Sequence, residues 1–92
     1  MFEWDERKRR SNLAKHRVDF KTIAHCDWAK ALEIEDARKN YGEVRYWAFL
    51  LLEARLHVVV FVQRGDVRRL VSARKANSRE VKFYEAENHR PH

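Results

Sequence analysis

Three apolar segments between Val44 and Lys75 constrain most strongly what this chain can fold into. They read VRYWAFLLLE, LHVVVFVQ and VRRLVSARK, and only short breaks separate them. The second break is Arg64-Gly65-Asp66, in which Gly65 can adopt the positive φ that a tight hairpin requires. Short apolar runs bounded by turn residues indicate buried strands. Because strands with such brief links must be antiparallel, the sequence predicts a three-stranded meander.

The first two segments are apolar at both odd and even positions. This holds for Val44–Glu53 after Arg45 and for Leu56–Val62. Such a strand is central in its sheet, either covered on both faces or covered on one face and used on the other to contact another chain. We therefore expect Leu56–Val62 at the buried centre, and Val44–Leu52 indicates a second covered face or a contact with another protein.

The segments before the meander predict two strands and two helices. Phe2-Glu3-Trp4 alternates like a short edge strand, and Ala31–Glu35 alternates like a half-buried strand. Asp5 is a candidate N-cap for a surface helix that runs to about Lys15–Arg17 and contacts the core through Leu13 and Ala14. Asp19 can cap a second helix over Phe20–Cys26, whose apolar stripe is Phe20, Ile23, Ala24 and Trp28.

The segments after these elements complete the predicted order. Asp36–Gly42 has loop chemistry, and Asn77 with Glu80 forms a capping box for a helix to about Asn88. Its apolar side is Val81, Tyr84 and Phe83, and a frayed tail follows at His89–His92. The order β-α-α-β-β-β-β-α predicts one α+β domain over residues 1–92, with the helices on one side of an antiparallel sheet of about four strands.

Composition excludes several classes of protein. The 92 residues are 45% hydrophobic and 12% aromatic, which is typical of one folded domain. No apolar run approaches the roughly 18 residues of a membrane span, so no membrane association is expected. The single cysteine, Cys26, cannot form an internal disulfide and fits a reducing cytoplasm. The net charge of +6 favours a polyanionic partner or an acidic protein.

Motifs for metals and cofactors are missing from the sequence. The chain has two glycines, too few for a phosphate-binding loop, and no CxxC or HxxxH pair. What remains is arginine on a sheet. By strict alternation Arg68 and Arg74 share one face and Arg69 lies on the other, unless a bulge near Ala73 changes the sorting. Guanidinium groups bind phosphate oxygens in a bidentate manner, so these arginines predict a phosphate-binding surface. Alternatively, they form salt bridges with Glu33, Glu35, Glu43 or Glu80.

Several motifs in this order resemble the BrnT toxins. They are the opening FEWD, the pattern NLxKHxVxF over Asn12–Phe20, the ALEIED strand, the RGD turn and SAR-x-A-x-x-RE over Ser72–Glu80. The resemblance covers the chain from Phe2 to about Glu85, although Arg17 replaces a glycine common after the Lys-His pair. It implies a RelE-like fold with two N-terminal helices packed on the sheet and a C-terminal helix.

The resemblance also implies a function. It is that of a cytoplasmic bacterial ribonuclease that inhibits translation until a BrnA-type ribbon-helix-helix antitoxin neutralises it. Operator DNA is then bound through the toxin–antitoxin complex, with a possible homodimer inside a heterotetramer. We expect metal-independent cleavage by the ribose 2′-hydroxyl, which needs a base, an acid and cations around the phosphate.

Candidate site residues follow from this chemistry. The candidate catalytic residues are Arg45, Arg69, Arg74, Glu43, Lys15 and His16, with Arg45 and Arg74 as the first choice for a phosphate clamp. The candidate RNA-binding residues are Arg64, Arg68, Lys75 and Trp4. No metal or cofactor is expected. Two alternatives use the same arginines without catalysis: a basic nucleic-acid-binding module, and a degenerate toxin that serves as a repressor subunit.

Overall fold

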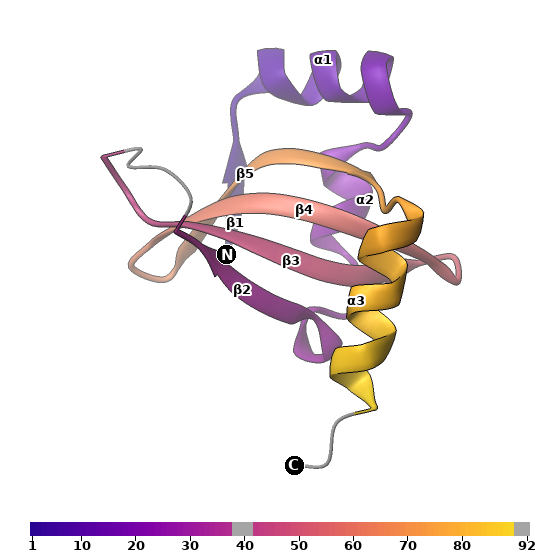
Figure 1. Ribbon diagram of the computed structural model, residues 1–92. Coiled ribbons are helices and arrows are strands. Elements are labelled where there is room, and N and C mark those ends of the chain that lie inside the picture. Colours follow the sequence, from indigo (N-terminus) through magenta and orange to yellow (C-terminus); the bar gives the residue numbers. More distant parts are fainter. Residues whose placement is uncertain (38–41, 90–92) are drawn as a thin grey trace.

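The computed structural model describes residues 1–37 and 42–89 (Figure 1). Its elements in chain order are β1 (Phe2–Trp4), α1 (Glu6–His16), α2 (Phe20–Ala24), a 3₁₀ turn (Trp28–Lys30), β2 (Leu32–Asp36), β3 (Arg45–Leu52), β4 (Arg55–Arg64), β5 (Val67–Lys75) and α3 (Ser78–Asn88). Parts of the predicted loop Asp36–Gly42 and of the predicted tail His89–His92 lie outside the described residues. No described helix is long and apolar enough to cross a membrane.

All five strands form one sheet in the order β1-β5-β4-β3-β2. Neighbours from β2 to β5 are antiparallel, as the short links require. β1 instead pairs parallel with β5, with Phe2 beside Arg68 and Trp4 beside Leu70. The α+β class is therefore confirmed, whereas the sheet has one strand more than expected and is mixed. The difference arises because β1 has no hairpin link to its neighbour, so its direction is free.

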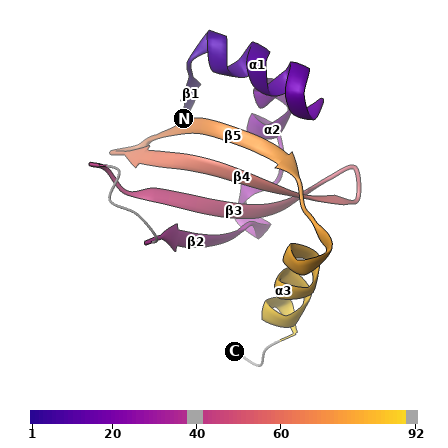
Figure 2. The same cartoon turned by 45° about the horizontal axis from the view of Figure 1, so that its top comes forward.

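Helices lie on both faces of the sheet, so the expectation that they share one side is wrong (Figures 1 and 2). Phe20 and Ile23 of the α2 helix pack with Phe61 and Leu70 in a first core. On the opposite face, α3 packs against a second core built of Phe49, Leu56, Val58 and Ala76, with Val81 and Tyr84 beside it. The link after β5 leads the chain around the end of the sheet to this second face.

The two helical layers explain why the central parts of β3 and β4 carry apolar side chains on both faces. Ala48 and Leu50 of β3 point into the first core, and Phe49 between them points into the second. The predicted buried centre is confirmed, because most of Leu56–Val62 is buried. Both faces of β3 are thus covered within the chain around Ala48, Phe49 and Leu50.

Asn12 joins α1 to the edge of the sheet. Its Nδ2 donates to the carbonyls of Ala73 (2.8 Å) and Val18 (2.9 Å), and its Oδ1 accepts from the Ala73 N–H (3.0 Å). The pairing of β1 with β5 ends at Leu70, so the Asn12 amide serves Ala73 as a neighbouring strand would. Asn12 is 7% exposed, whereas Leu13 is 37% exposed. The predicted contact through Leu13 and Ala14 is therefore wrong.

The strand β5 contains a bulge beside this anchor. Leu70 lies opposite Phe61, but the next residue of β4, Val60, lies opposite Ser72, so Val71 is an extra residue. A bulge of this kind reverses the alternation of side chains in the residues that follow it. Leu70 and Ala73 consequently both point into the first core although they are three positions apart.

Removing the Asn12 amide should destabilise the fold. We expect Asn12→Ala to lower the free energy of unfolding by about 2–4 kcal/mol, because buried backbone groups of Ala73 and Val18 lose their partners. Urea denaturation followed by circular dichroism measures the change. The exposed neighbour gives a control: Leu13→Ala should stay within about 0.5 kcal/mol of the parent. Equal midpoints for both variants would contradict this role.

Arg17 terminates α1 in a left-handed conformation, with φ of 61° and its N–H bonded to the Leu13 carbonyl. A residue with a side chain is strained there, and glycine is not. We expect Arg17→Gly to raise the free energy of unfolding by about 0.5–1 kcal/mol. Arg10→Gly, within the exposed part of α1, should lower it by about 1 kcal/mol. Thermal melts of both variants test the difference in sign.

Candidate active site

The bulge in β5 decides which arginines lie together. Arg69 is opposite Val62 and Arg74 is opposite Val58, and these two valines are on the α3 side of β4. Arg45 of β3 is also opposite Val62, so it has the same orientation. Arg69, Arg74 and Arg45 therefore share one face, and Arg68 lies on the other. The strict-alternation expectation that Arg68 and Arg74 share a face is wrong, because it counted no extra residue between them.

Arg45 and Arg69 form a pair across Val62. Each is the direct cross-strand neighbour of this valine, one from β3 and one from β5. Since neighbouring strands are about 4.8 Å apart, their Cα atoms are separated by roughly 10 Å, within reach of two guanidinium groups on one phosphate. Val62 is only 2% exposed, as expected where aliphatic stems of long side chains cover it. The pair belongs to the first residues of β3 and β5, and the starts of these two strands lie away from α3 (Figure 1).

Acidic side chains hold the arginines at this end of the sheet. Nη1 of Arg69 lies 3.5 Å from Glu3, the residue of β1 that is directly beside it. Arg64 contacts Glu43 at 3.0 Å and Glu3 at 4.0 Å. Glu3 thus contacts both Arg69 and Arg64, and Glu43 contacts Arg64 from its other side, so acidic and basic side chains alternate. We call Arg45, Arg64, Arg69 and Arg74 the arginine face.

Arg74 has a different role from the Arg45–Arg69 pair. Both of its Nη atoms donate to Glu80, each at 2.7 Å, in a fork-to-fork ion pair that ties β5 to the first turn of α3. Glu80 also completes the capping box with Asn77. The Arg74 hydrogen bonds lower the pKa of Glu80, and Glu80 in turn raises the pKa of Arg74. Arg74 also lies opposite Val58, roughly 13 Å along β4 from the level of Val62.

Lys15 and His16 border the arginine face from α1. A cavity of about 200 Å³ lies between α1 and β5. Its lining residues are Lys8, Ser11, Asn12, Lys15, His16, Val71 and Ser72. Ser72 is opposite Val60 and so has the orientation of Arg69 and Arg74. The cavity therefore opens beside the bulge, between the basic last turn of α1 and the β5 edge.

The remaining candidates, Arg68, Trp4 and Lys75, lie on the opposite face of the sheet, the face of the first core. The Arg68 guanidinium rests on the Trp28 and Phe61 rings and binds Glu33 at 2.7 Å. Trp4 packs edge-on against Phe20 in the first core. Lys75 is exposed beside His57, on the far side from Arg74. The structure does not bring these residues to the arginine face.

His57 is a buried histidine on this same opposite face. Its Nδ1 lies 2.8 Å from the Arg55 carbonyl, which fixes the ring orientation and places the proton on that nitrogen. Burial lowers the pKa of the imidazole, so the neutral form is preferred. It lies on the opposite side of the sheet from the arginine face.

Sequence reasoning missed Asn12, Glu3 and Ser72 as parts of the site. Asn12 stands within the NLxKHxVxF pattern, and a polar residue fixed one turn before the Lys-His pair is the signal that points to it. Glu3 gives no signal, because its proximity to Arg69 depends on the parallel pairing of β1. Among residues 1–37 and 42–89, no three His, Cys, Asp or Glu side chains gather into a metal site.

The Arg74–Glu80 pair should make stability depend on pH. Since the folded state lowers the Glu80 pKa, its contribution is full above the ordinary value of 4.5 and is lost as the pH falls below it. We expect Glu80→Gln to be less stable near neutral pH, with a difference from the parent that narrows towards about pH 3. Urea midpoints across this range measure it. Glu85→Gln, an exposed change in α3, should show no such convergence.

The sequence was compared with known protein families. Residues 4–80 match the family described as the ribonuclease toxin, BrnT, of type II toxin–antitoxin systems. A comparison with curated proteins gave no match. The family match covers most of the chain and includes every candidate catalytic residue. The chain belongs to the BrnT family of ribonuclease toxins, whose activity is controlled by an antitoxin partner.

Proposed function

We propose that this toxin is a metal-independent endoribonuclease and that the arginine face is its active site. The 2′-oxygen of a ribose attacks the adjacent phosphorus while the bond to the 5′-oxygen breaks. The products are a 2′,3′-cyclic phosphate and a 5′-hydroxyl. One group accepts the 2′-hydroxyl proton, and another gives a proton to the leaving oxygen. The observation that carries the proposal is the placement of Arg45 and Arg69 on either side of Val62.

Arg45 and Arg69 serve as the phosphate clamp. The non-bridging oxygens gain negative charge in the transition state, and fixed guanidinium groups stabilise that charge most when they are already in place. The half-buried Arg69 is supported by Glu3 at 3.5 Å, which orients it before substrate arrives. Arg69 therefore replaces Arg74 as the partner of Arg45 in the clamp, because Arg74 lies opposite Val58 and so further from Arg45 along the sheet.

Arg74 is the third member of the clamp. A guanidinium has five N–H groups. Glu80 takes two of them, and a third approaches the Lys75 carbonyl at 3.4 Å. The remaining N–H groups can meet a neighbouring phosphate of the RNA, while the ion pair keeps the planar group in one orientation.

Lys15 and His16 are the candidates for proton transfer. They line the cavity that opens beside Ser72, on the edge of the arginine face. An imidazole can both accept and donate a proton, so His16 suits either role, and the neighbouring lysine adds positive charge. Glu43 is a weaker candidate, because Arg64 binds its carboxylate through Nε and Nη2. We keep Arg64 as an RNA-binding residue, since it is the most exposed arginine of the set.

The partners follow from the family and the charge. We infer a BrnA-type ribbon-helix-helix antitoxin that neutralises the toxin in the cytoplasm, and operator DNA bound through the complex. A homodimer of the toxin inside a heterotetramer remains part of this hypothesis. The net charge of +6 supports both an RNA substrate and an antitoxin that is acidic overall.

Arg68 and Arg69 allow a matched test, because they are adjacent and point to opposite faces. We expect Arg69→Ala and Arg45→Ala to slow RNA cleavage by about 10²–10³-fold, the usual cost of one transition-state contact. Arg68→Ala should change the rate only a few-fold, whatever it does to stability. Gel assays with purified toxin and RNA measure the rates, with circular dichroism as the check on folding.

Chelator and growth assays complete the test. Cleavage should persist in excess EDTA, and induction of the parent chain should arrest growth until the antitoxin is expressed. Full activity in folded Arg69→Ala, or equal losses in Arg68→Ala and Arg69→Ala, would contradict the assignment. RNA that is bound but never cleaved by the parent would indicate a non-catalytic basic module or a degenerate toxin instead.

A further inference from the structure

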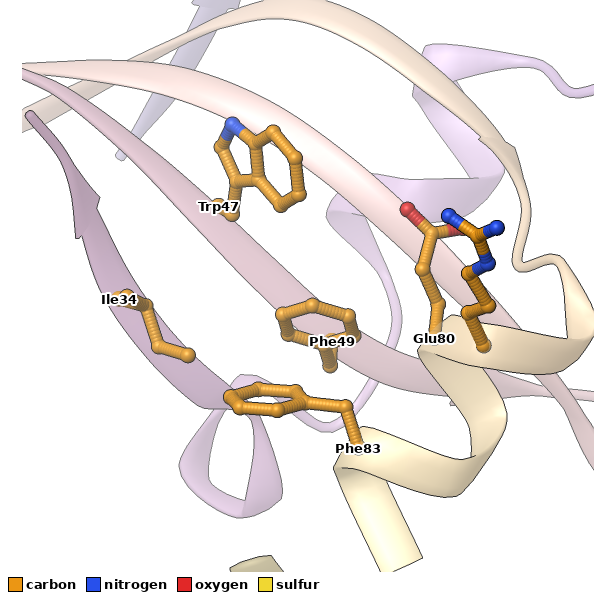
Figure 3. Close-up of a pocket in the computed structure, with 6 residues that line it drawn as sticks. Ile34, Trp47, Phe49, Glu80 and Phe83 are labelled. Carbon is orange, nitrogen blue, oxygen red and sulfur yellow. The ribbon is translucent and has the colours of Figure 1, made fainter. Parts of the chain in front are cut away.

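An apolar groove lies on the α3 side of the sheet, beyond the arginine face. It has a volume of about 320 Å³ and is lined by the apolar side chains of Ile34, Trp47, Phe49 and Phe83, together with Arg79 and Glu80 (Figure 3). Phe83 is 42% exposed although its ring packs 5.5 Å from that of Phe49. A large aromatic side chain this exposed beside an apolar hollow is typical of a contact surface.

The groove runs along the open edge of the sheet. β2 is the last strand of the sheet and pairs only with β3 (Figures 1 and 2). In the part of the chain that the structure describes, the backbone of 32–35 makes no hydrogen bonds on its other side. An edge strand with open N–H and C=O groups is a template for an added strand.

The side chains of β2 define what such a strand must look like. Leu32 and Ile34 point to the groove face, beside the second core. Glu33 and Glu35 point to the other face, where Glu35 is exposed and Glu33 forms an ion pair with Arg68 at 2.7 Å. Because cross-strand neighbours share a face, an added strand would place alternate residues in the groove and the intervening ones beside these glutamates. It should therefore alternate apolar with basic side chains.

A second copy of this chain pairs unfavourably wherever most of the two β2 strands overlap. Antiparallel pairing of two β2 strands about a twofold axis centred on Ile34 places Glu33 of one copy opposite Glu35 of the other. Centring the axis on Glu33 or Glu35 places that residue opposite itself. Like charges directly opposite each other destabilise a sheet. The charges therefore favour a different protein as the occupant.

We propose that the β2 edge and the adjoining groove bind an extended segment of the antitoxin, which adds a sixth strand to the sheet. The segment alternates apolar residues, which enter the groove at Ile34 and Phe83, with basic residues, which meet Glu33 and Glu35. This identification of the occupant rests on the proposed control by an antitoxin. Trp47 lines the groove and has the orientation of Arg45, two residues before it, so the bound segment lies against the arginine face.

The test uses the folded chain and its purified cognate antitoxin. Hydrogen exchange should show slower exchange of β2 amides in the complex. Phe83→Asp should weaken antitoxin binding on the order of tenfold or more, because the complex loses an aromatic side chain that the bound segment covers. Leu51→Asp is the matched control and should bind as the parent does, since Leu51 is equally apolar, 53% exposed and outside the groove.

A second variant tests the charge pattern. It also keeps the proposal testable when Phe83→Asp does not fold. Glu35→Lys, at an exposed position, should weaken binding several-fold, and the loss should shrink at high salt. A short synthetic peptide that alternates valine and lysine should compete with the antitoxin, whereas one that alternates valine and glutamate should not.

The outcomes separate this proposal from the active-site proposal. Unchanged antitoxin binding by folded Phe83→Asp and Glu35→Lys, or unprotected β2 amides, would overturn the docking surface. Self-association that depends on Phe83 would overturn the choice of occupant. An antitoxin that binds here to a chain unable to cleave RNA would contradict the proposed catalysis and still support the docking surface.

Discussion

The hydrogen bonds between the Asn12 amide and the backbone of Ala73 are the contact on which the rest of the architecture depends. β1 is only three residues long, so it covers β5 as far as Leu70 and no further. A buried N–H and C=O at Ala73 would otherwise lack partners, a cost of a few kcal/mol in a small domain. The side chain of a helix supplies what a strand would have supplied. It also fixes how α1 lies along the edge of the sheet.

The anchored bulge in β5 determines how the strand displays its charges. Before the extra residue Val71, Arg69 points to the α3 side and Arg68 to the other. After it, Arg74 returns to the side of Arg69. One insertion thus separates a structural arginine, held on aromatic rings against Glu33, from arginines on an uncovered face. Bulges are frequently found where a strand must redirect a side chain near a functional site.

Acidic partners hold the side chains of the arginine face in fixed orientations, and the guanidinium groups keep their positive charge. Glu3 contacts both Arg64 and Arg69, and Glu80 holds Arg74 through two hydrogen bonds. Each contact is partly exposed and adds little stability, but it reduces the number of conformations available to a long side chain. A face prepared in this way matches the requirement for fixed positive charge around a phosphate in its transition state.

The sequence by itself determined the α+β class, the buried meander, the capping box of α3 and the presence of a basic sheet surface. These follow from local patterns: apolar runs with short links, Asn77 with Glu80, and arginines interleaved with valines. The family pattern determined the ribonuclease class. It also singled out Arg45, Arg69 and Arg74 for the phosphate clamp, although it favoured Arg74 over Arg69.

Only the tertiary structure decided which arginines share a face of the sheet, which face α3 covers, and that Asn12 rather than Leu13 joins α1 to the sheet. These depend on contacts between residues far apart in the chain, such as Asn12 with Ala73 and Glu3 with Arg69. A period-two pattern cannot reveal an extra residue, since Val71 looks like any other valine of a strand. The bulge exists because a side chain from another element satisfies the backbone beside it, and that partner is visible only in the folded molecule.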